Sequence, residues 1–182
     1  MFERLVRTNC YSKNKHLRRL AANLLEKLYA CQVHCDDIDE SVRFAHHGRG
    51  CTIVAAKLCA GVVIFQNVTI GSNLRYDKRT STWENVGNPI VGDNVVICDG
   101  AKILGPIVVG DDSVIAAGAI VTRDVPPQSV VVGVNRCTPK DANYALVFNA
   151  DMIAPDDIVR ANKALIERFE ATRAGNGASR SA

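Results

Sequence analysis

The spacing of apolar positions changes along the chain from a helical period to a period of six. Between Lys13 and Ala30, apolar residues recur at steps of three and four, which places them on one stripe of a helix. The stripe consists of Leu17, Leu20, Ala21, Leu24, Leu25, Leu28 and Tyr29. An amphipathic helix has to bury such a stripe, so we expect this helix to pack on the main domain or on a sister subunit rather than in a membrane.

A fixed spacing of six residues dominates the middle of the chain. Large apolar residues stand six positions apart in two runs: Leu58, Ile64 and Ile70, and then Val91, Ile97, Ile103, Val109, Ile115 and Val121. Gly, Asp and Asn recur between them. This period is typical of a parallel β-helix, in which each hexad forms one short strand and one turn and three hexads form a coil. Alternating strands of a β-sandwich would follow a period of two instead. The coils must stack to bury their inward residues.

One interruption breaks the period. Ile70 and Val91 are 21 residues apart, which is not a multiple of six, so residues 72–88 are expected to leave the coil as a loop. The loop is polar and carries Trp83, the only tryptophan of the chain. Long loops in compact domains are usually functional or disordered.

The last region begins after the two prolines at 126–127. One more strand is expected at residues 129–134, then a linker and a second helix that starts near Pro155, since proline suits the first helical position. The small, polar residues 175–182 are expected to be disordered. The expected organisation is a helical segment at 1–30, a β-helix at 31–140 with its loop at 72–88, and a C-terminal helix and tail at 141–182.

The composition of the chain is typical of a globular protein. The chain has 182 residues, 47% of them apolar and 23% charged. Its net charge of +3, from 22 basic and 19 acidic residues, is too balanced to indicate nucleic acid or a membrane surface as a partner. We see neither an apolar run near the roughly 20 residues of a spanning helix nor the apolar segment of a signal peptide. We therefore expect a cytoplasmic protein without membrane insertion.

The seven cysteines are expected to be reduced thiols, because their number is odd and no secretion signal is seen. Cys31, His34 and Cys35 have a spacing that zinc tolerates, but no second Cys/His pair follows at finger spacing. We therefore expect buried thiols and no metal site here.

Several motifs between residues 42 and 136 resemble the serine acetyltransferase branch of the hexapeptide-repeat acyltransferases. They are Ala-His-His-Gly at 45–48, Phe-Gln-Asn-Val-Thr-Ile-Gly at 65–71, Gly-Ala-Lys-Ile-Leu-Gly at 100–105, Ala-Ala-Gly-Ala-Ile-Val at 116–121 and Asp-Val-Pro-Pro at 124–127. The resemblance implies a left-handed parallel β-helix, usually a homotrimer, that transfers an acetyl group from acetyl-CoA. The mainly β fold would carry one helix at each end.

The resemblance also implies a general base. His46 aligns with the family's catalytic histidine, 25 residues before Gly71. Transfer of an acetyl group from a thioester to a hydroxyl needs a base, and the pKa of histidine suits this near neutral pH. His47 either contacts substrate or is an exposed bystander. Four acids one coil upstream are candidates to orient His46, without a choice among them: Asp36, Asp37, Asp39 and Glu40.

Acetyl-CoA is expected in a groove between neighbouring subunits. On the family alignment, its pantetheine and thioester pass along Gly71, Asp99, Ala117 and Gly118. Its phosphates need basic partners, and those nearest the last coil are Arg123, Arg136 and Lys140. Ordinary turn residues and solvated charges are the alternative interpretation of these positions.

Three departures from the family concern the acceptor. Where serine acetyltransferases keep charged residues, this chain has Gln32, Ala45 and Asn88. A zwitterion such as serine binds poorly without ionic partners. Asn88 suits neutral hydroxyls, and Tyr76 and Trp83 offer faces that stack on sugar rings. We therefore expect an acetyl-CoA-dependent O-acetyltransferase that acts on a sugar of a polysaccharide or its precursor, closest in pattern to the O-acetyltransferases of polysaccharide biosynthesis.

Three alternatives remain. The first is a serine O-acetyltransferase of cysteine biosynthesis, and the second acetylates a hydroxyl of a small secondary metabolite. The third is a non-catalytic β-helix, such as a scaffold or a relative of γ-class carbonic anhydrase. The zinc version of the third is disfavoured because all four histidines lie within the first 47 residues.

Overall fold

The computed structural model describes residues 1–72, 75–84, 86–143 and 159–169. The chain divides into two compact units, Met1–Leu146 and Val147–Ala182. The described part of the second unit is a helix over residues 159–169. Its apolar residues are about half exposed: Val159, Leu165, Ile166 and Phe169. Pro155 and the tail at 175–182 lie outside the described residues.

Two helices precede the β-structure: α1 (Phe2–Tyr11) and α2 (Lys15–Tyr29). The side chain of Asn14 caps the start of α2 by accepting hydrogen bonds from two backbone N–H groups, and Ala30 ends it with a left-handed φ of 50°. The amphipathic helix expected from Lys13 to Ala30 is therefore present. The sequence pattern did not reveal α1, whose buried stripe is short and includes the polar Asn9.

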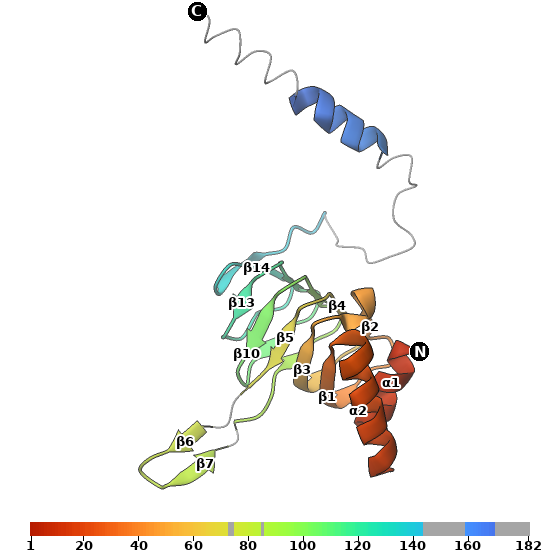
Figure 1. The fold of residues 1–182 in the computed structure, drawn as a ribbon. Coiled ribbons are helices and arrows are strands. Elements are labelled where there is room, and N and C mark those ends of the chain that lie inside the picture. The colour runs from red at the N-terminus through yellow and green to blue at the C-terminus, as the bar shows by residue number, and fades with distance from the viewer. Residues whose placement is uncertain (73–74, 85, 144–158, 170–182) are drawn as a thin grey trace, which may run out of the picture. The chain divides into compact units, whose positions relative to one another are not determined.

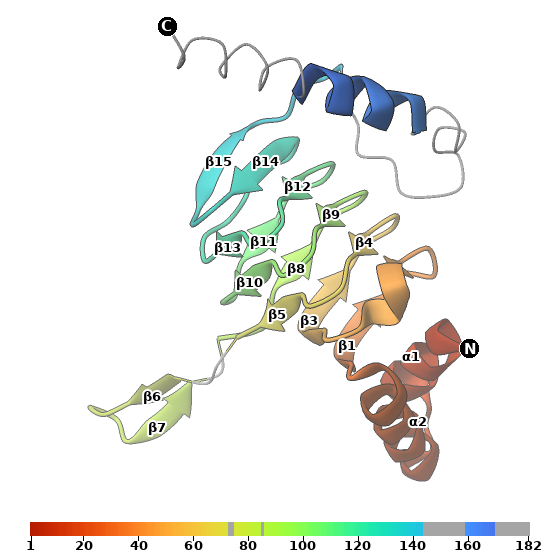
Figure 2. The same cartoon turned by 45° about the horizontal axis from the view of Figure 1, so that its top comes forward.

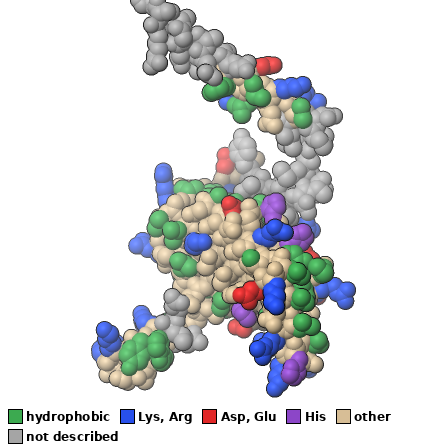
Figure 3. Space-filling model, viewed as in Figure 1, with side chains coloured by type: hydrophobic (Ala, Val, Ile, Leu, Met, Phe, Trp, Pro, Cys, Tyr) green, Lys and Arg blue, Asp and Glu red, His purple; other side chains and the backbone are tan. Residues whose placement is uncertain are grey.

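Helix α2 buries only one side of its apolar stripe. Ala21 and Leu25 are buried, whereas Leu17, Leu20 and Leu28 are about half exposed. Figure 3 shows apolar side chains next to Lys and Arg over these helices. The expected packing on the main domain thus accounts for half of the stripe.

The β-helix has three faces, which Figures 1 and 2 show as stacked coils. The first face contains the leading halves of β1 (Gln32–Ile38) and β3 (Thr52–Leu58), followed by β5 (Thr69–Gly71), β10 (Lys102–Leu104) and β13 (Ile120–Val121). The second contains the trailing halves of β1 and β3, then β8 (Ile90–Val91) and β11 (Val108–Val109). The third contains β2 (Arg43–Phe44), β4 (Val63–Ile64), β9 (Val96–Ile97), β12 (Val114–Ile115) and β14 (Ser129–Val132).

The inward residues of each face stack in register. Ile70 pairs with Ile53 below it and with Ile103 above it, and all three are fully buried. All nine apolar residues that recur at a spacing of six in the two runs are at most 1% exposed. The β-helix expected from the hexads is therefore confirmed, together with its N-terminal and C-terminal helices.

The segment at 72–88 leaves the coil as expected. It contains an antiparallel hairpin of β6 (Arg75–Asp77) and β7 (Thr82–Glu84), which pair only with each other among the described strands. The expected strand at 129–134 is β14, but a further strand, β15 (Arg136–Pro139), pairs antiparallel with it where a linker was expected. Within the described residues, we find no helix long and apolar enough to cross a membrane.

Candidate active site

A column of turns joins the third face to the first, and we call it the corner column. Its members are residues 45–50, which begin with the short helix η1 (Ala45–Gly48), then Gln66–Asn67, Asp99–Gly100 and Ala117–Gly118. Backbone bonds link successive turns: Asn67 N–H donates to Arg49 O at 2.8 Å, Gly100 N–H to Gln66 O at 3.1 Å, and Gly118 N–H to Asp99 O at 2.8 Å. The column thus places the turn that carries His46 in one stack with Asp99, Ala117 and Gly118.

The upper turns of the corner column share a left-handed backbone. The φ angles of Asn67, Gly100 and Gly118 are 58°, 70° and 66°. Asn67 Nδ2 also donates to Asp99 Oδ1 at 3.1 Å. Ala117 and Gly118 are exposed, and a Cβ added to Gly118 would meet no atom within 4 Å. The top of the column therefore has open space beside its backbone.

The lowest turn carries both histidines in a strained conformation. His46 and His47 have φ angles of 51° and 56°, which are uncommon for residues other than glycine. An aromatic cluster holds the turn in place. Phe2 packs edge-on to Phe44 and Tyr29 with ring centroids 5.3 and 5.0 Å away, and Tyr29 stacks on His47 at 5.6 Å. The N-terminal helices therefore position the histidine turn.

The two histidines differ in their surroundings. His46 is exposed, with its ring centroid 6.5 Å from that of Phe65 on the next coil. His47 is also exposed but packs on Tyr29 and Phe2. The packing of His47 gives it a structural contact, and a role in substrate binding stays a prediction.

Three of the four acids proposed to orient His46 bind other partners. Asp37 pairs with Lys57 at 2.8 Å and Glu40 with Arg7 at 2.8 Å. Asp39 accepts from Ser41 Oγ at 2.6 Å, and this bond and the Ser41 N–H hold the pKa of Asp39 below its usual value. The fourth of these acids, Asp36, is exposed.

A second group of expected site residues lies at the other end of the first face. Gly71 ends β5, where the hairpin segment leaves the coil. Asn88 Oδ1 accepts from Ser72 Oγ at 3.0 Å at the base of this segment. Tyr76 and Trp83 face each other across the hairpin with ring centroids 5.1 Å apart, and they are 45% and 67% exposed. Within one protomer these residues and His46 belong to different corners.

The basic residues expected to bind phosphates are spread over the last coil. Arg123 is exposed just after β13, and Arg136 is exposed on β15. Lys140 Nζ donates to Asp112 O at 3.2 Å, in the turn between the second and third faces. Lys140 is therefore engaged at a different column of turns, because β15 folds back along the third face.

The cysteine–histidine motif on β1 does not converge on one point. Cys31 and Cys35 are buried whereas His34 is exposed, since neighbouring strand residues point to opposite sides. Burial raises the pKa of Cys31 and of Cys35 to about 12. Within the described ranges we find no group of three side chains suited to hold a metal ion.

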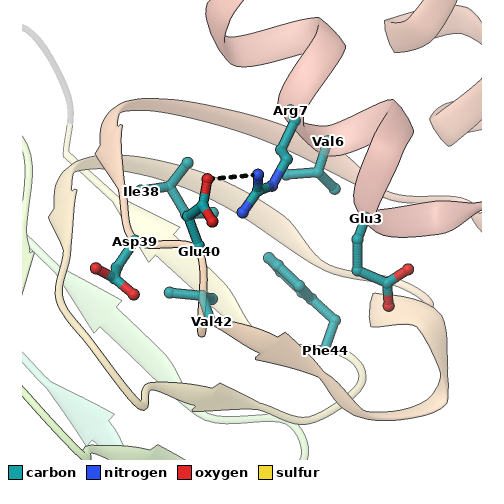
Figure 4. Close-up of a pocket in the computed structure, with 8 residues that line it drawn as sticks. All are labelled: Glu3, Val6, Arg7, Ile38, Asp39, Glu40, Val42 and Phe44. Carbon is teal, nitrogen blue, oxygen red and sulfur yellow. Dashed lines mark hydrogen bonds and ion pairs between the residues drawn. The ribbon is translucent and has the colours of Figure 1, made fainter.

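Two pockets lie between the N-terminal helices and the first coil. The first is shown in Figure 4, where Arg7 reaches from α1 to Glu40 and the ring of Phe44 forms one wall. The second lies between α2 and the start of β1 and is lined by Asn9, Ala22, Leu25, Glu26, Cys31, Gln32, Val33 and His34. It adjoins the end of the histidine turn, because Cys31, which lines it, has its sulfur beside Gly48.

Comparisons with known proteins agree with this architecture. Residues 88–123 match the family model described as bacterial transferase hexapeptide (six repeats). This segment of the chain is therefore similar to hexapeptide-repeat transferases. A serine acetyltransferase of Mycobacterium tuberculosis is 39% identical over 120 residues, which cover 65% of this chain and 49% of the relative. One from Staphylococcus xylosus is 29% identical over 180 residues, covering 96% of this chain and 79% of the relative.

Solved structures of serine acetyltransferases have a fold similar to that of this chain. A serine acetyltransferase in complex with CoA superposes with a TM-score of 0.56 at 28% identity, over 68% of this chain and 49% of that chain. The Neisseria gonorrhoeae serine acetyltransferase gives a TM-score of 0.57 at 26% identity, over 75% and 51%. The chain thus spans about half the length of these proteins. The homologues are named serine acetyltransferase, and they do not support the expected closeness to polysaccharide enzymes.

Proposed function

We propose that the chain transfers an acetyl group from acetyl-CoA to the hydroxyl of a small acceptor, with His46 as general base. The observation that carries the proposal is the corner column, which stacks His46 under Asp99, Ala117 and Gly118 with open space beside the upper turns. The relatives named serine acetyltransferase, one of them solved with CoA, support the same chemistry.

The proposed reaction is a direct transfer. Acetyl-CoA supplies the thioester. His46 removes the proton of the acceptor hydroxyl as its oxygen attacks the thioester carbonyl, and the proton then passes to the sulfur that leaves. The exposure of His46 leaves its ring accessible to both substrates. The small residues of the upper column would let the cofactor approach the backbone closely.

L-serine is the acceptor that the relatives' names favour over a sugar. One contact of Gln32 also supports serine as the acceptor. Gln32 stands where the family keeps an acid, but its Nε2 donates to Glu26 Oε1 at 3.4 Å, so α2 places a carboxylate beside that position. Glu26 and Gln32 line the same pocket next to the histidine turn. This carboxylate would bind the ammonium group of serine.

A neutral hydroxyl, such as that of a sugar, is the second candidate. Ala45, at the position of the family's other acid, is 3% exposed and carries no charge. Asn88 and the exposed pair of Tyr76 and Trp83 offer hydrogen bonds and stacking surfaces of the kind that sugars use.

We also propose a homotrimer. The corner column and the base of the hairpin segment lie at opposite ends of the first face in one protomer. A neighbouring copy would bring its hairpin segment to the corner column and close the site.

A thiol-release assay with acetyl-CoA tests the function, using L-serine and nucleotide sugars as acceptors. We expect release with L-serine, and His46→Ala should lower turnover by roughly 10²–10⁴-fold without changing the affinity for acetyl-CoA. Release only with sugars would establish the second candidate. Near-normal turnover of the variant would exclude His46 as the base.

A further inference from the structure

The cavity between α2 and the start of β1 is lined by polar groups that have few partners in the protein. It is partly open and encloses about 390 Å³. A water molecule takes up about 30 Å³ of liquid, so the cavity has room for a molecule of several heavy atoms. One of its walls is Asn9 of α1, which is only 5% exposed. Asn9 Nδ2 donates to Val33 O, whereas no described residue donates to Asn9 Oδ1. Buried side chains normally have their polar atoms paired, so this oxygen is available to a donor that enters the cavity.

Glu26 adds a negative charge to the same cavity. It is the only acid of α2. None of the ion pairs among the described residues involves Glu26, and its carboxylate accepts only a long bond of 3.4 Å from Gln32 Nε2. A carboxylate without a cation partner favours an ammonium group as its ligand. Glu26 and Asn9 Oδ1 together therefore offer two acceptors to one ammonium group.

His34 offers a donor on the opposite side of the cavity from this charge along β1. It lies two residues after Gln32 on the same side of the strand, and both are exposed and line the cavity. Alternate residues of a strand are roughly 6.6 Å apart. The imidazole ring carries an N–H donor in either tautomer. An α-amino acid spans such a separation, because its ammonium and carboxylate share one carbon and each adds a hydrogen bond of about 2.8 Å.

We propose that His34 selects an α-amino acid as the acceptor, and this proposal rests on the proposed function. The ring N–H of His34 donates to the carboxylate of the acceptor, while Glu26 and Asn9 Oδ1 accept from its ammonium group. The hydroxyl of the acceptor remains free to face the histidine turn, which the cavity adjoins where Cys31 lies beside Gly48. A neutral sugar has neither charged group and gains nothing from these contacts.

Replacement of His34 tests the carboxylate contact without any need for activity. The affinities of L-serine and of ethanolamine, which lacks the carboxylate, are measured by NMR titration without acetyl-CoA. The unmodified protein should bind L-serine at least roughly 10-fold more tightly, the worth of a hydrogen bond to a charged group, and His34→Leu should bind the two about equally. His34→Gln keeps a donor and should retain part of the preference. The matched control is His16→Leu, at an exposed histidine of α2 that does not line the cavity, and it should bind like the unmodified protein.

Replacement of Glu26 tests the ammonium contact in the same way. The second ligand is 3-hydroxypropanoate, which has the carboxylate and the hydroxyl of L-serine but no ammonium group. The unmodified protein should bind it at least roughly 10-fold more weakly than L-serine, and Glu26→Gln should reduce this difference to about threefold or less. Glu3→Gln, at an exposed acid of α1 outside this cavity, is the matched control. In the thiol-release assay, His34→Leu and Glu26→Gln should each raise the KM for L-serine about 10-fold or more, with the KM for acetyl-CoA within about twofold.

The outcomes separate the cavity from the proposed function. Loss of the carboxylate preference in His34→Leu, together with loss of the ammonium preference in Glu26→Gln, supports the proposal. An unchanged preference in either variant overturns it, and so does equal binding of L-serine and ethanolamine by the unmodified protein. If His34→Leu does not fold, His34→Gln must show a reduced preference for the proposal to stand. Thiol release with L-serine whose KM neither variant changes would keep the proposed function and overturn the role of His34. Binding of L-serine through both groups without thiol release would keep the contacts and overturn the proposed function.

Discussion

Gly118 offers a test that separates backbone strain from obstruction of the proposed cofactor groove. Its φ of 66° lies in the left-handed region, and a Cβ at this position would meet nothing within 4 Å in the protomer. Asn67, two turns below in the same corner column, adopts a φ of 58° with a full side chain. Asparagine is therefore compatible with this turn, whereas alanine is strained there.

Alanine at position 118 causes more backbone strain than asparagine, whereas asparagine fills more of the space beside the turn. Gly118→Ala should lower the free energy of unfolding by about 1–2 kcal/mol, the left-handed penalty for a residue with a Cβ, and the melting temperature by roughly 2–8 °C. Gly118→Asn should cost less, because its side chain tolerates this conformation. If acetyl-CoA passes Gly118, asparagine should raise the KM for acetyl-CoA about 10-fold or more, and alanine should raise it less.

The assay combines thermal unfolding with thiol-release kinetics at varied acetyl-CoA concentration. We expect the lower melting temperature in Gly118→Ala, which is the more strained variant, and the higher KM for acetyl-CoA in Gly118→Asn, which has the larger side chain. An equal KM for acetyl-CoA in all three proteins would refute the placement of the cofactor along the corner column. A KM that rises in step with the loss of stability would instead point to a damaged fold.

Two other predictions concern the hairpin segment and the assembly. Deletion of Arg75 to Glu84 removes β6 and β7, which pair with no other described strand, so the fold should persist and the acceptor's KM should rise more than that of acetyl-CoA; a larger change for acetyl-CoA would mean that the hairpin covers the cofactor. Light scattering at micromolar concentration should give the mass of three chains, and a monomer would contradict the proposal that a neighbour closes the site.

The β-helix was predictable because its energetics repeat. Each inward position, such as Ile97, Ile103 or Ile115, meets the same environment as its neighbours one coil away, so the same residue type recurs at a fixed spacing. The hairpin segment was predictable for the complementary reason, since it breaks the phase between Ile70 and Val91. The corner column breaks this repetition at its lowest turn, where residues 45–52 separate Phe44 from Ile53, whereas only residues 65–69 separate Ile64 from Ile70 one coil above.

The support of the histidine turn was not predictable in this way. The ring of Phe2 packs against Tyr29, Phe44 and His47, although His47 lies 45 positions further along the sequence, and these contacts follow no period. They depend on how α1 and α2 pack on the first coil, which no local pattern encodes.

The acceptor argument at Gln32 lacked information that only the fold supplies. Gln32 removes a charge from an aligned position, and an alignment counts that charge as lost. In the fold, the carboxylate of Glu26 approaches Gln32 from α2, a helix that lies outside the repeats. A ligand responds to the charge in its pocket, whichever element supplies it. A substitution at a repeat position therefore bears on the acceptor only after the helices packed against that coil have been placed.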